Sequence, residues 1–245
     1  MNGRAVASSS YILQDQHLMA GAKNYFEWQC RLVTRELGRR VLEVGSGIGN
    51  FTGMLLDREA VMALDIEQEC VERLKSRFAD RANLYAFACD WGGPDWEEQA
   101  LPCITAFRPD SCICLNVLEH FEDDREALRR MANVLMPGGV IVLLVPAFPA
   151  LFGPIDKLLG HQRRYTRESI RRLAESAGLE IGALHYMNAI GFFGWWANAH
   201  VFRREVQSEG QIGFFDRFIV PMSSRIESLV KPPFGQSLLA VLRKR

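Results

Sequence analysis

The stretch that most constrains the fold of this chain is a glycine-rich turn at residues 41–52, VLEVGSGIGNFT. Apolar residues that favour β-structure surround Glu43, and Gly45, Gly47 and Gly49 then alternate before residues that can begin a helix. Glycine permits a sharp reversal and lets a ligand approach the backbone without a Cβ in the way. The pattern predicts a strand, a tight turn and a helix N-terminus around a polar ligand. An ordinary turn between a strand and a helix is the alternative.

The glycine spacing argues against a dinucleotide site. The dinucleotide fingerprint is Gly-x-Gly-x-x-Gly, whereas Asn50 stands here where the last glycine should be. The turn therefore indicates a ligand other than a dinucleotide.

An acidic residue follows at the end of the next predicted strand, residues 61–64. Asp65 lies 20 residues after Gly45, and an acid at the tip of the second strand is placed to accept both hydroxyls of an adenosine ribose. In the alternative, Asp65 caps the following helix, whose apolar face is Val71, Leu74 and Phe78.

A third predicted strand, residues 84–88, leads into Asp90 and Trp91. An acid followed by an aromatic residue suits an adenine, because the carboxylate accepts from the exocyclic amine and an apolar side chain covers the ring. Plain packing is the alternative for Trp91.

Strands and helices alternate through the rest of the first half. Residues 111–116 form a fourth strand, a helix follows with Asp123 and Glu126 as a capping box, and residues 140–145 are an uninterrupted apolar run. This order predicts a doubly wound parallel sheet, whose ligand binds at the carboxyl ends of the strands. Asn116 lies at such an end.

Taken together, residues 19–145 resemble the class I S-adenosylmethionine (SAM) dependent methyltransferases. The resemblance is carried by EVGSGIG at residues 43–49, Asp65, NVLEH at residues 116–120 and MPGG at residues 136–139. It implies an α/β fold with a doubly wound, seven-stranded Rossmann-like sheet, parallel with one antiparallel edge strand. It also implies SAM as cofactor and S-adenosyl-L-homocysteine as product. The expected cofactor-binding residues are Tyr25, Glu43, Gly45, Gly47, Asp65, Ile66, Asp90, Trp91 and Asn116.

The second half contains the run GHQRRYT at residues 160–166. It resembles a bacterial subgroup of the superfamily (type 11/12) that is grouped with the ubiquinone-type O-methyltransferases. Thr166 can cap a helix, which places this run over the functional edge of the sheet. His161, His120 and Tyr165 are the candidate catalytic residues, and Arg163 and Arg164 are candidate substrate ligands. As alternatives, the histidines hydrogen-bond a loop and the arginines anchor the nearby acidic helix.

An insertion at residues 188–236 precedes the last predicted strand, residues 237–243, and follows a sixth strand at residues 179–186. We expect it to be α-helical and aromatic, with Trp195 and Trp196 as substrate-binding residues. Its aromatic residues and arginines suit an apolar acceptor pocket, a subdomain core, a dimer interface or a lipid surface.

A metal ion is not expected. Some relatives bind a divalent metal through Glu-x-x-Glu-His, but Asn116 occupies the first of these positions.

Composition indicates an ordinary globular chain of 245 residues with a formal net charge of zero. Residues 157–245 nevertheless hold 14 Lys and Arg against 7 Asp and Glu, so an anionic acceptor, a membrane surface or a solvated basic face is expected there. We find no secretory signal and no apolar stretch long enough to span a bilayer, and six cysteines without a Cys-x-x-Cys pair should be reduced. These features predict a cytoplasmic protein.

The predicted organisation is one methyltransferase domain over residues 1–245. Residues 11–37 form a lid helix, and residues 146–166 and 188–236 are acceptor-side insertions.

The sequence therefore predicts methyl transfer from SAM to a small, partly apolar acceptor that is anionic or lipid-like. Transfer to oxygen is expected, by proximity and with an optional histidine base. The rival is a non-catalytic module that binds a membrane or a protein partner through the C-terminal third. A nucleic-acid partner is not expected, because no Asn-Pro-Pro-Tyr type motif follows the fourth strand. The oligomeric state stays open.

Overall fold

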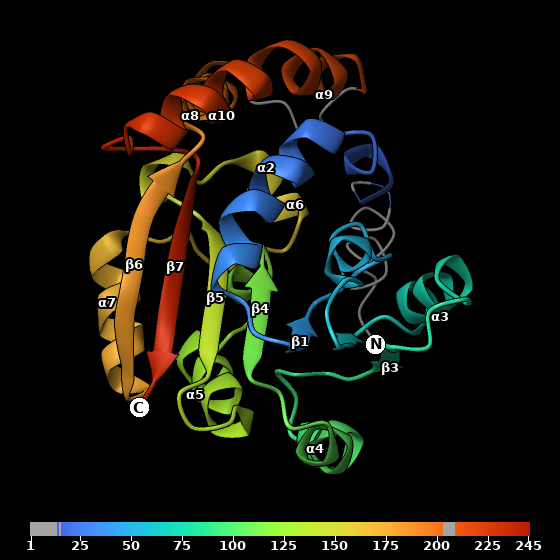
Figure 1. The fold of residues 1–245 in the computed structure, drawn as a ribbon. Helices are drawn as coiled ribbons and strands as arrows, with labels where there is room; N and C mark the ends of the chain where they lie inside the picture. The colour runs from blue at the N-terminus through green and yellow to red at the C-terminus, as the bar shows by residue number, and fades with distance from the viewer. Residues whose placement is uncertain (1–13, 15, 203–208) are drawn as a thin grey trace.

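The computed structural model describes residue 14, residues 16–202 and residues 209–245, and its centre is a seven-stranded sheet (Figure 1). The strand order is β3-β2-β1-β4-β5-β7-β6. The strands are β1 (Arg40–Val44), β2 (Ala60–Asp65), β3 (Leu84–Ala88), β4 (Ser111–Leu115), β5 (Val140–Pro146), β6 (Leu179–Met187) and β7 (Ser237–Lys244). Pairs among β1 to β5 are parallel, and β7 is antiparallel to both β5 and β6. The predicted fold class is confirmed.

Helices cover both faces of the sheet. They are α2 (Lys23–Val33), α3 (Gln68–Arg77), α4 (Trp96–Phe107), α5 (Asp124–Val134), α6 (Pro154–Leu158), α7 (Arg167–Ser176), α8 (Ala189–Ala197), α9 (Glu209–Phe214) and α10 (Val220–Leu229). Buried residues of α4, α5 and α7 pack on one face, while α2 and α10 contribute to the core on the other. Every residue of β5 is buried, as expected for a strand covered on both sides.

Three local predictions differ from the structure. The helix expected at residues 11–37 starts outside the described residues, and the described part is interrupted by a turn at Ala20 and Gly21 before α2 begins. The helix expected after the glycine turn is only a short 3₁₀ segment, Thr52–Leu55. Helix α4 was not predicted, because Pro102 lies inside it and proline is a poor helix-interior residue. Its apolar face compensates by burying Trp96, Ala100, Ile104 and Phe107.

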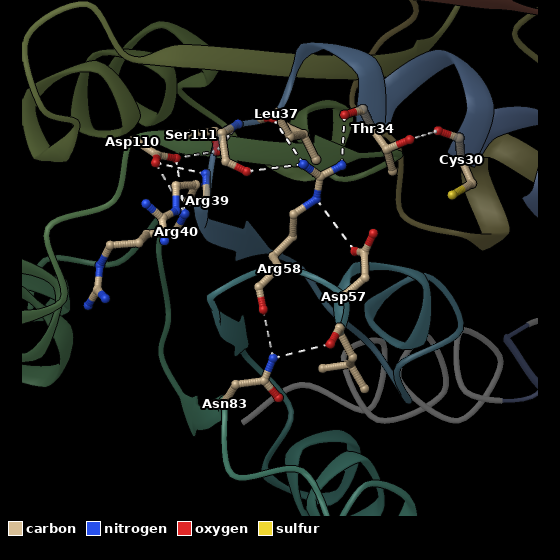
Figure 2. Close-up of polar contacts among 12 residues, drawn as sticks. Cys30, Thr34, Leu37, Arg39, Arg40, Asp57, Arg58, Asn83, Asp110 and Ser111 are labelled. Carbon is tan, nitrogen blue, oxygen red and sulfur yellow. Dashed lines mark hydrogen bonds and ion pairs between the residues drawn. The ribbon is translucent and has the colours of Figure 1, made fainter.

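Polar side chains close the loops at the amino ends of the strands (Figure 2). Arg58 donates to the carbonyl oxygens of Thr34, Leu37 and Gly38 at 2.9, 3.2 and 3.3 Å. Asp110 accepts from the backbone N–H of Arg39 at 2.8 Å, just before β1. These contacts hold the start of β1 at the amino ends of the parallel strands, opposite the glycine turn.

The C-terminal helices α8, α9 and α10 cover the carboxyl ends of the parallel strands, and we call them the roof (Figure 1). Figure 1 shows α8, α9 and α10 across the top of the molecule, above the carboxyl ends of β4 and β5. Asp216 accepts from the backbone N–H of Asn24 at 3.2 Å and of Tyr25 at 2.8 Å, which ties the roof to α2. Glu227 accepts from the backbone N–H of Asn188 and Ala189 at 2.9 and 2.8 Å. Asp216 thus holds the insertion against α2, and Glu227 joins the two ends of the insertion to each other.

None of the helices in the described ranges combines the length and the apolar character needed to cross a membrane.

Candidate active site

A cavity of about 1220 Å³ lies at the carboxyl ends of the parallel strands, beneath the roof. Gly45, Asp65, Asp90 and Asn116, which follow four different strands, all line it. The remaining expected cofactor-binding residues, Tyr25, Glu43, Gly47, Ile66 and Trp91, also line it. The structure therefore brings this whole predicted set to one space.

The glycine turn has the backbone that its sequence predicts. Gly45, Gly47 and Gly49 have φ values of +79°, +53° and +83°, a region that favours glycine. A Cβ on Gly45 would also overlap the side chain of Val117. The N–H groups of Gly45 and Ser46 donate to the carbonyl of Leu64 at 2.8 and 2.9 Å, which fixes the turn against β2.

Asp65 lies directly beneath this turn. Its carboxylate accepts from the backbone N–H of Gly47 at 2.6 Å and of Glu67 at 3.0 Å, and the residue is 8% exposed. Burial raises the pKa of its carboxyl group. Glu67 precedes α3, and no side chain caps the start of that helix, so the capping alternative is not supported. Asp65 instead fixes two loops and lines the cavity.

Glu43 is the most deeply buried acid of the cofactor end. Its carboxyl group accepts from the hydroxyl of Thr52 at 2.7 Å, and burial raises its pKa to about 8. The carboxyl group of Glu43 is therefore mostly protonated at neutral pH.

Asp90 and Trp91 follow β3 and have different surroundings. Asp90 accepts from the backbone N–H of Gly92 and Gly93 at 3.1 and 3.0 Å, which closes a tight turn. Trp91 is 3% exposed, donates to the carbonyl of Ala127 at 3.2 Å and packs on Trp96 with 4.9 Å between ring centroids. The packing alternative therefore accounts for most of the surface of Trp91. Ile66 is 62% exposed beside Asp65, where an apolar side chain can cover a ring.

The acceptor-side loop is organised by Asp156, which sequence reasoning missed. This fully buried carboxylate accepts from Arg164 Nε at 2.8 Å, from Arg164 Nη2 at 3.1 Å and from the backbone N–H of Gly153 at 2.9 Å. Its Oδ1 lies 2.9 Å from Nδ1 of His161. Burial alone would raise its pKa, but the hydrogen bonds from His161 and the charge of Arg164 lower it. An ionised Asp156 therefore holds a proton on Nδ1 of His161.

Glu119 is the second residue that sequence reasoning missed as a site. It is fully buried, lines the cavity, and neither of its carboxyl oxygens has a hydrogen-bond partner. Its Oε1 lies 3.8 Å from Nε2 of His161, and burial raises its pKa to about 7. A buried carboxyl group without a partner is costly. The available signal was the Glu-His pair after β4, which was interpreted only as part of a metal motif.

His120 completes this cluster. Its ring is edge-on to that of His161 with 4.8 Å between centroids, and burial lowers its pKa to about 4. Ligand atoms of Glu119, His120 and His161 all lie within 4.8 Å of one another, so this group could hold a metal ion. The expected absence of a metal stays a prediction.

Two candidate site residues of the GHQRRYT run, Arg163 and Tyr165, do not line the cavity. The hydroxyl of Tyr165 donates to the carbonyl of Leu118 at 3.2 Å and to Asp124 at 2.9 Å, and burial raises its pKa. Arg163 pairs with Asp124 at 2.9 Å and donates to the carbonyl of Glu122 at 2.8 Å. Both anchor the start of α5. For Arg163 this is the alternative that the sequence left open. This geometry does not favour the catalytic role predicted for Tyr165 or the substrate-binding role predicted for Arg163.

The remaining candidates divide between the cavity and the surface. Arg164 and Trp195 line the cavity, with the guanidinium of Arg164 4.9 Å from the centre of the Trp195 ring. Trp196 does not line it and is 48% exposed. Trp195 therefore faces the cavity, whereas Trp196 is exposed at the surface.

Comparisons with known proteins point to methyltransferases. Residues 42–141 match the model of a methyltransferase domain. A protein of Mycolicibacterium smegmatis named a probable S-adenosylmethionine-dependent methyltransferase is 27% identical over 156 residues, 62% of this chain and 56% of that protein. The chain spans about half the length of the curated relatives it matches.

Solved structures share the fold. One chain from the complex of the Haloferax volcanii Trm112 methyltransferase activator is 18% identical with a TM-score of 0.59, over 98% of this chain and 96% of that one. An O-methyltransferase from neocarzinostatin biosynthesis, crystallised with SAM and 2-hydroxy-5-methyl naphthoic acid, is 17% identical with a TM-score of 0.52, over 84% of this chain and 48% of that one.

Proposed function

We propose that this chain, which belongs to the class I SAM-dependent methyltransferase superfamily and has SAM as its cofactor, methylates a small, partly apolar acceptor at an oxygen atom. The observation that carries the proposal is the continuity of the cavity. The same space is lined by the glycine turn and Asp65 at one end and by Glu119 and His161 at the other. Its volume of about 1220 Å³ exceeds what one drug-sized ligand usually occupies, which suits a cofactor together with an acceptor.

The cofactor end fits SAM. Asp65 would hold the ribose hydroxyls, Ile66 and Asp90 would hold the adenine, and Glu43 with the glycine turn would hold the amino-acid end. SAM supplies a methyl group on a sulfonium, so the leaving group is already activated and the protein contributes mainly proximity and alignment.

The acceptor end supplies a proton acceptor. Because Asp156 holds a proton on Nδ1 of His161, Nε2 is free to accept the proton of an acceptor hydroxyl, and the ionised Asp156 then stabilises the imidazolium. The carboxyl group of Glu119, 3.8 Å from that nitrogen, can hydrogen-bond the same hydroxyl. Apolar cavity residues such as Trp195 and Phe215 would hold the rest of the acceptor.

The experiment that tests the proposal incubates the protein with SAM carrying a deuterated methyl group and with polar and lipid extracts of bacterial cells. Mass spectrometry should reveal a labelled product, and its hydrolysis behaviour identifies the methylated atom. With the acceptor in hand, His161→Gln should lower the rate by roughly 100-fold or more, because a positioned base contributes that much, while SAM affinity is unchanged.

The matched control is His185→Gln, because His185 lies on β6 outside the cavity lining. A wild-type protein that binds SAM but labels nothing in either extract would contradict the proposed activity. Equal rates in the His161 variant and the wild type would exclude the base.

A further prediction concerns the proton on Glu43. Because its pKa is about 8 in the free protein, the carboxyl group is largely protonated at about pH 7. The ammonium group at the amino-acid end of SAM favours the carboxylate form of Glu43, so binding should release close to one proton at about pH 7 and almost none above about pH 9. Calorimetry in buffers of different ionisation enthalpy measures this number. The release should vanish in Glu43→Gln and persist in Glu59→Gln, and identical binding heats in all buffers would contradict it.

A non-catalytic module that binds a membrane or a protein is the second candidate. Large apolar side chains exposed on the C-terminal helices support a binding surface there. They do not account for the buried, unpartnered carboxyl group of Glu119 inside the cavity, so we favour the enzyme.

A further inference from the structure

α9, the π-helical turn Phe215–Ile219 and α10 form one helical segment, which carries a row of exposed apolar side chains. Its first four members are spaced by four residues, which places them along one side of a helix. Their exposed fractions range from 49% to 86%. The row consists of Phe214, Phe218, Met222, Ile226 and Leu229. The opposite side of the same segment is buried through Ile212, Val220, Ser223 and Glu227. We call this exposed row the outer face of the roof.

A second group of exposed apolar residues lies on α8 and on the π-helix Asn198–Phe202 that follows it. Phe193 and Trp196 are 60% and 48% exposed, and Val201 and Phe202 are 60% and 62% exposed. Phe202 and Phe214 also line the large cavity. Each group therefore contributes an exposed aromatic side chain to the rim of the cavity.

The charges on this segment are separated by side. Asp216 and Glu227 point inward and accept backbone hydrogen bonds from α2 and from the start of α8. Arg217, Arg225 and Lys231 are exposed. In residues 209–231 the exposed ionisable side chains are these three and Glu209, which leaves a positive outer face.

We propose that the outer face of the roof docks on an anionic lipid surface. Apolar side chains with cationic residues beside them are the composition of helices that lie in the plane of a bilayer interface. The basic residues complement the charge of anionic headgroups.

Docking in this orientation has a consequence for the acceptor, which rests on the proposed function. The cavity rim at Phe202 and Phe214 would face the lipid, so an apolar chain could pass from the bilayer to Trp195 without crossing water. The acceptor class that fits is a lipid whose hydroxyl-bearing headgroup reaches Glu119 and His161.

Vesicle flotation of the full chain tests the docking. Binding to vesicles of mixed phosphatidylcholine and phosphatidylglycerol is expected, and phosphatidylcholine alone should bind at least tenfold more weakly. The triple variant Met222→Ser, Ile226→Ser, Leu229→Ser should lose binding at least tenfold, and so should Arg225→Glu with Lys231→Glu. Tyr85→Ser, at an exposed aromatic residue on β3, is the matched control and should bind like the wild type. Circular dichroism confirms that each variant is folded.

The outcomes separate docking from catalysis. Asp65→Ala should still float with the anionic vesicles even if it no longer binds SAM, whereas the triple variant should keep its SAM affinity. Failure of the wild type to bind anionic vesicles overturns the proposal. Sedimentation that shows a dimer, lost in the triple variant and unaffected by vesicles, would also overturn it and would assign the face to a second copy of the chain.

Discussion

Replacing Asp65 by alanine is expected to weaken SAM binding by roughly 100- to 10,000-fold. Two hydrogen bonds from ribose hydroxyls to a carboxylate contribute about 1.5–3 kcal/mol each. The same carboxylate also holds the N–H of Gly47 at 2.6 Å, so the variant loosens the glycine turn as well. Isothermal calorimetry measures the dissociation constant, and the wild type should bind SAM but not NAD.

The control variants distinguish recognition from collapse of the turn. Asp65→Asn keeps one acceptor oxygen for Gly47 and should lose less affinity than Asp65→Ala. Asp57→Ala, at an acid whose side chain is 74% exposed, should bind SAM normally. Wild-type affinity in Asp65→Ala would show that the ribose is held elsewhere, and tight NAD binding without SAM binding would refute the cofactor assignment.

Replacing Asp156 by alanine is expected to lower the free energy of unfolding by about 3–5 kcal/mol, because it leaves a buried guanidinium without its partner. Arg164 and His161 both lose their contacts of 2.8 and 2.9 Å. Since the pKa of Asp156 is lowered in the folded protein, its contribution is complete above its ordinary pKa and is lost as the pH falls. The difference between wild type and variant should therefore narrow in acid. Urea denaturation measures it.

An exposed ion pair on α7 is the matched control. Glu168 and Arg172 lie 3.0 Å apart with side chains 60% and 75% exposed, and Glu168→Ala should cost no more than about 1 kcal/mol. A loss of similar size in Asp156→Ala would show that water replaces the carboxylate and that the loop is not held by this residue.

The sheet and the cofactor end could be predicted because their signals are local. The apolar run at residues 140–145 and the glycine turn each identify an element without knowledge of its neighbours. Asp65 and Asp90 could then be assigned because the carboxyl ends of parallel strands meet at one edge of a sheet. Thr166 likewise caps α7 as predicted, by accepting from the N–H of Ser169 at 3.1 Å.

The acceptor end could not be predicted because its contacts are not local. Nothing in the pattern around Asp156 distinguishes it from a surface acid, and its burial depends on Arg164 and on the roof above it. Burial likewise raises the pKa of Glu119, and no motif in the sequence indicates that this residue is buried. The sequence predicted site roles for both Arg163 and Tyr165, but in the structure both side chains bond to Asp124.

Asp216 links the roof to α2, and residues on both sides of this link line the same cavity. This carboxylate joins two segments whose contacting residues are 191 and 192 positions apart in the chain. Tyr25 on one side and Phe215 on the other line the same cavity. A replacement of the roof would therefore also remove the hydrogen bond that holds Tyr25 at the wall of this cavity.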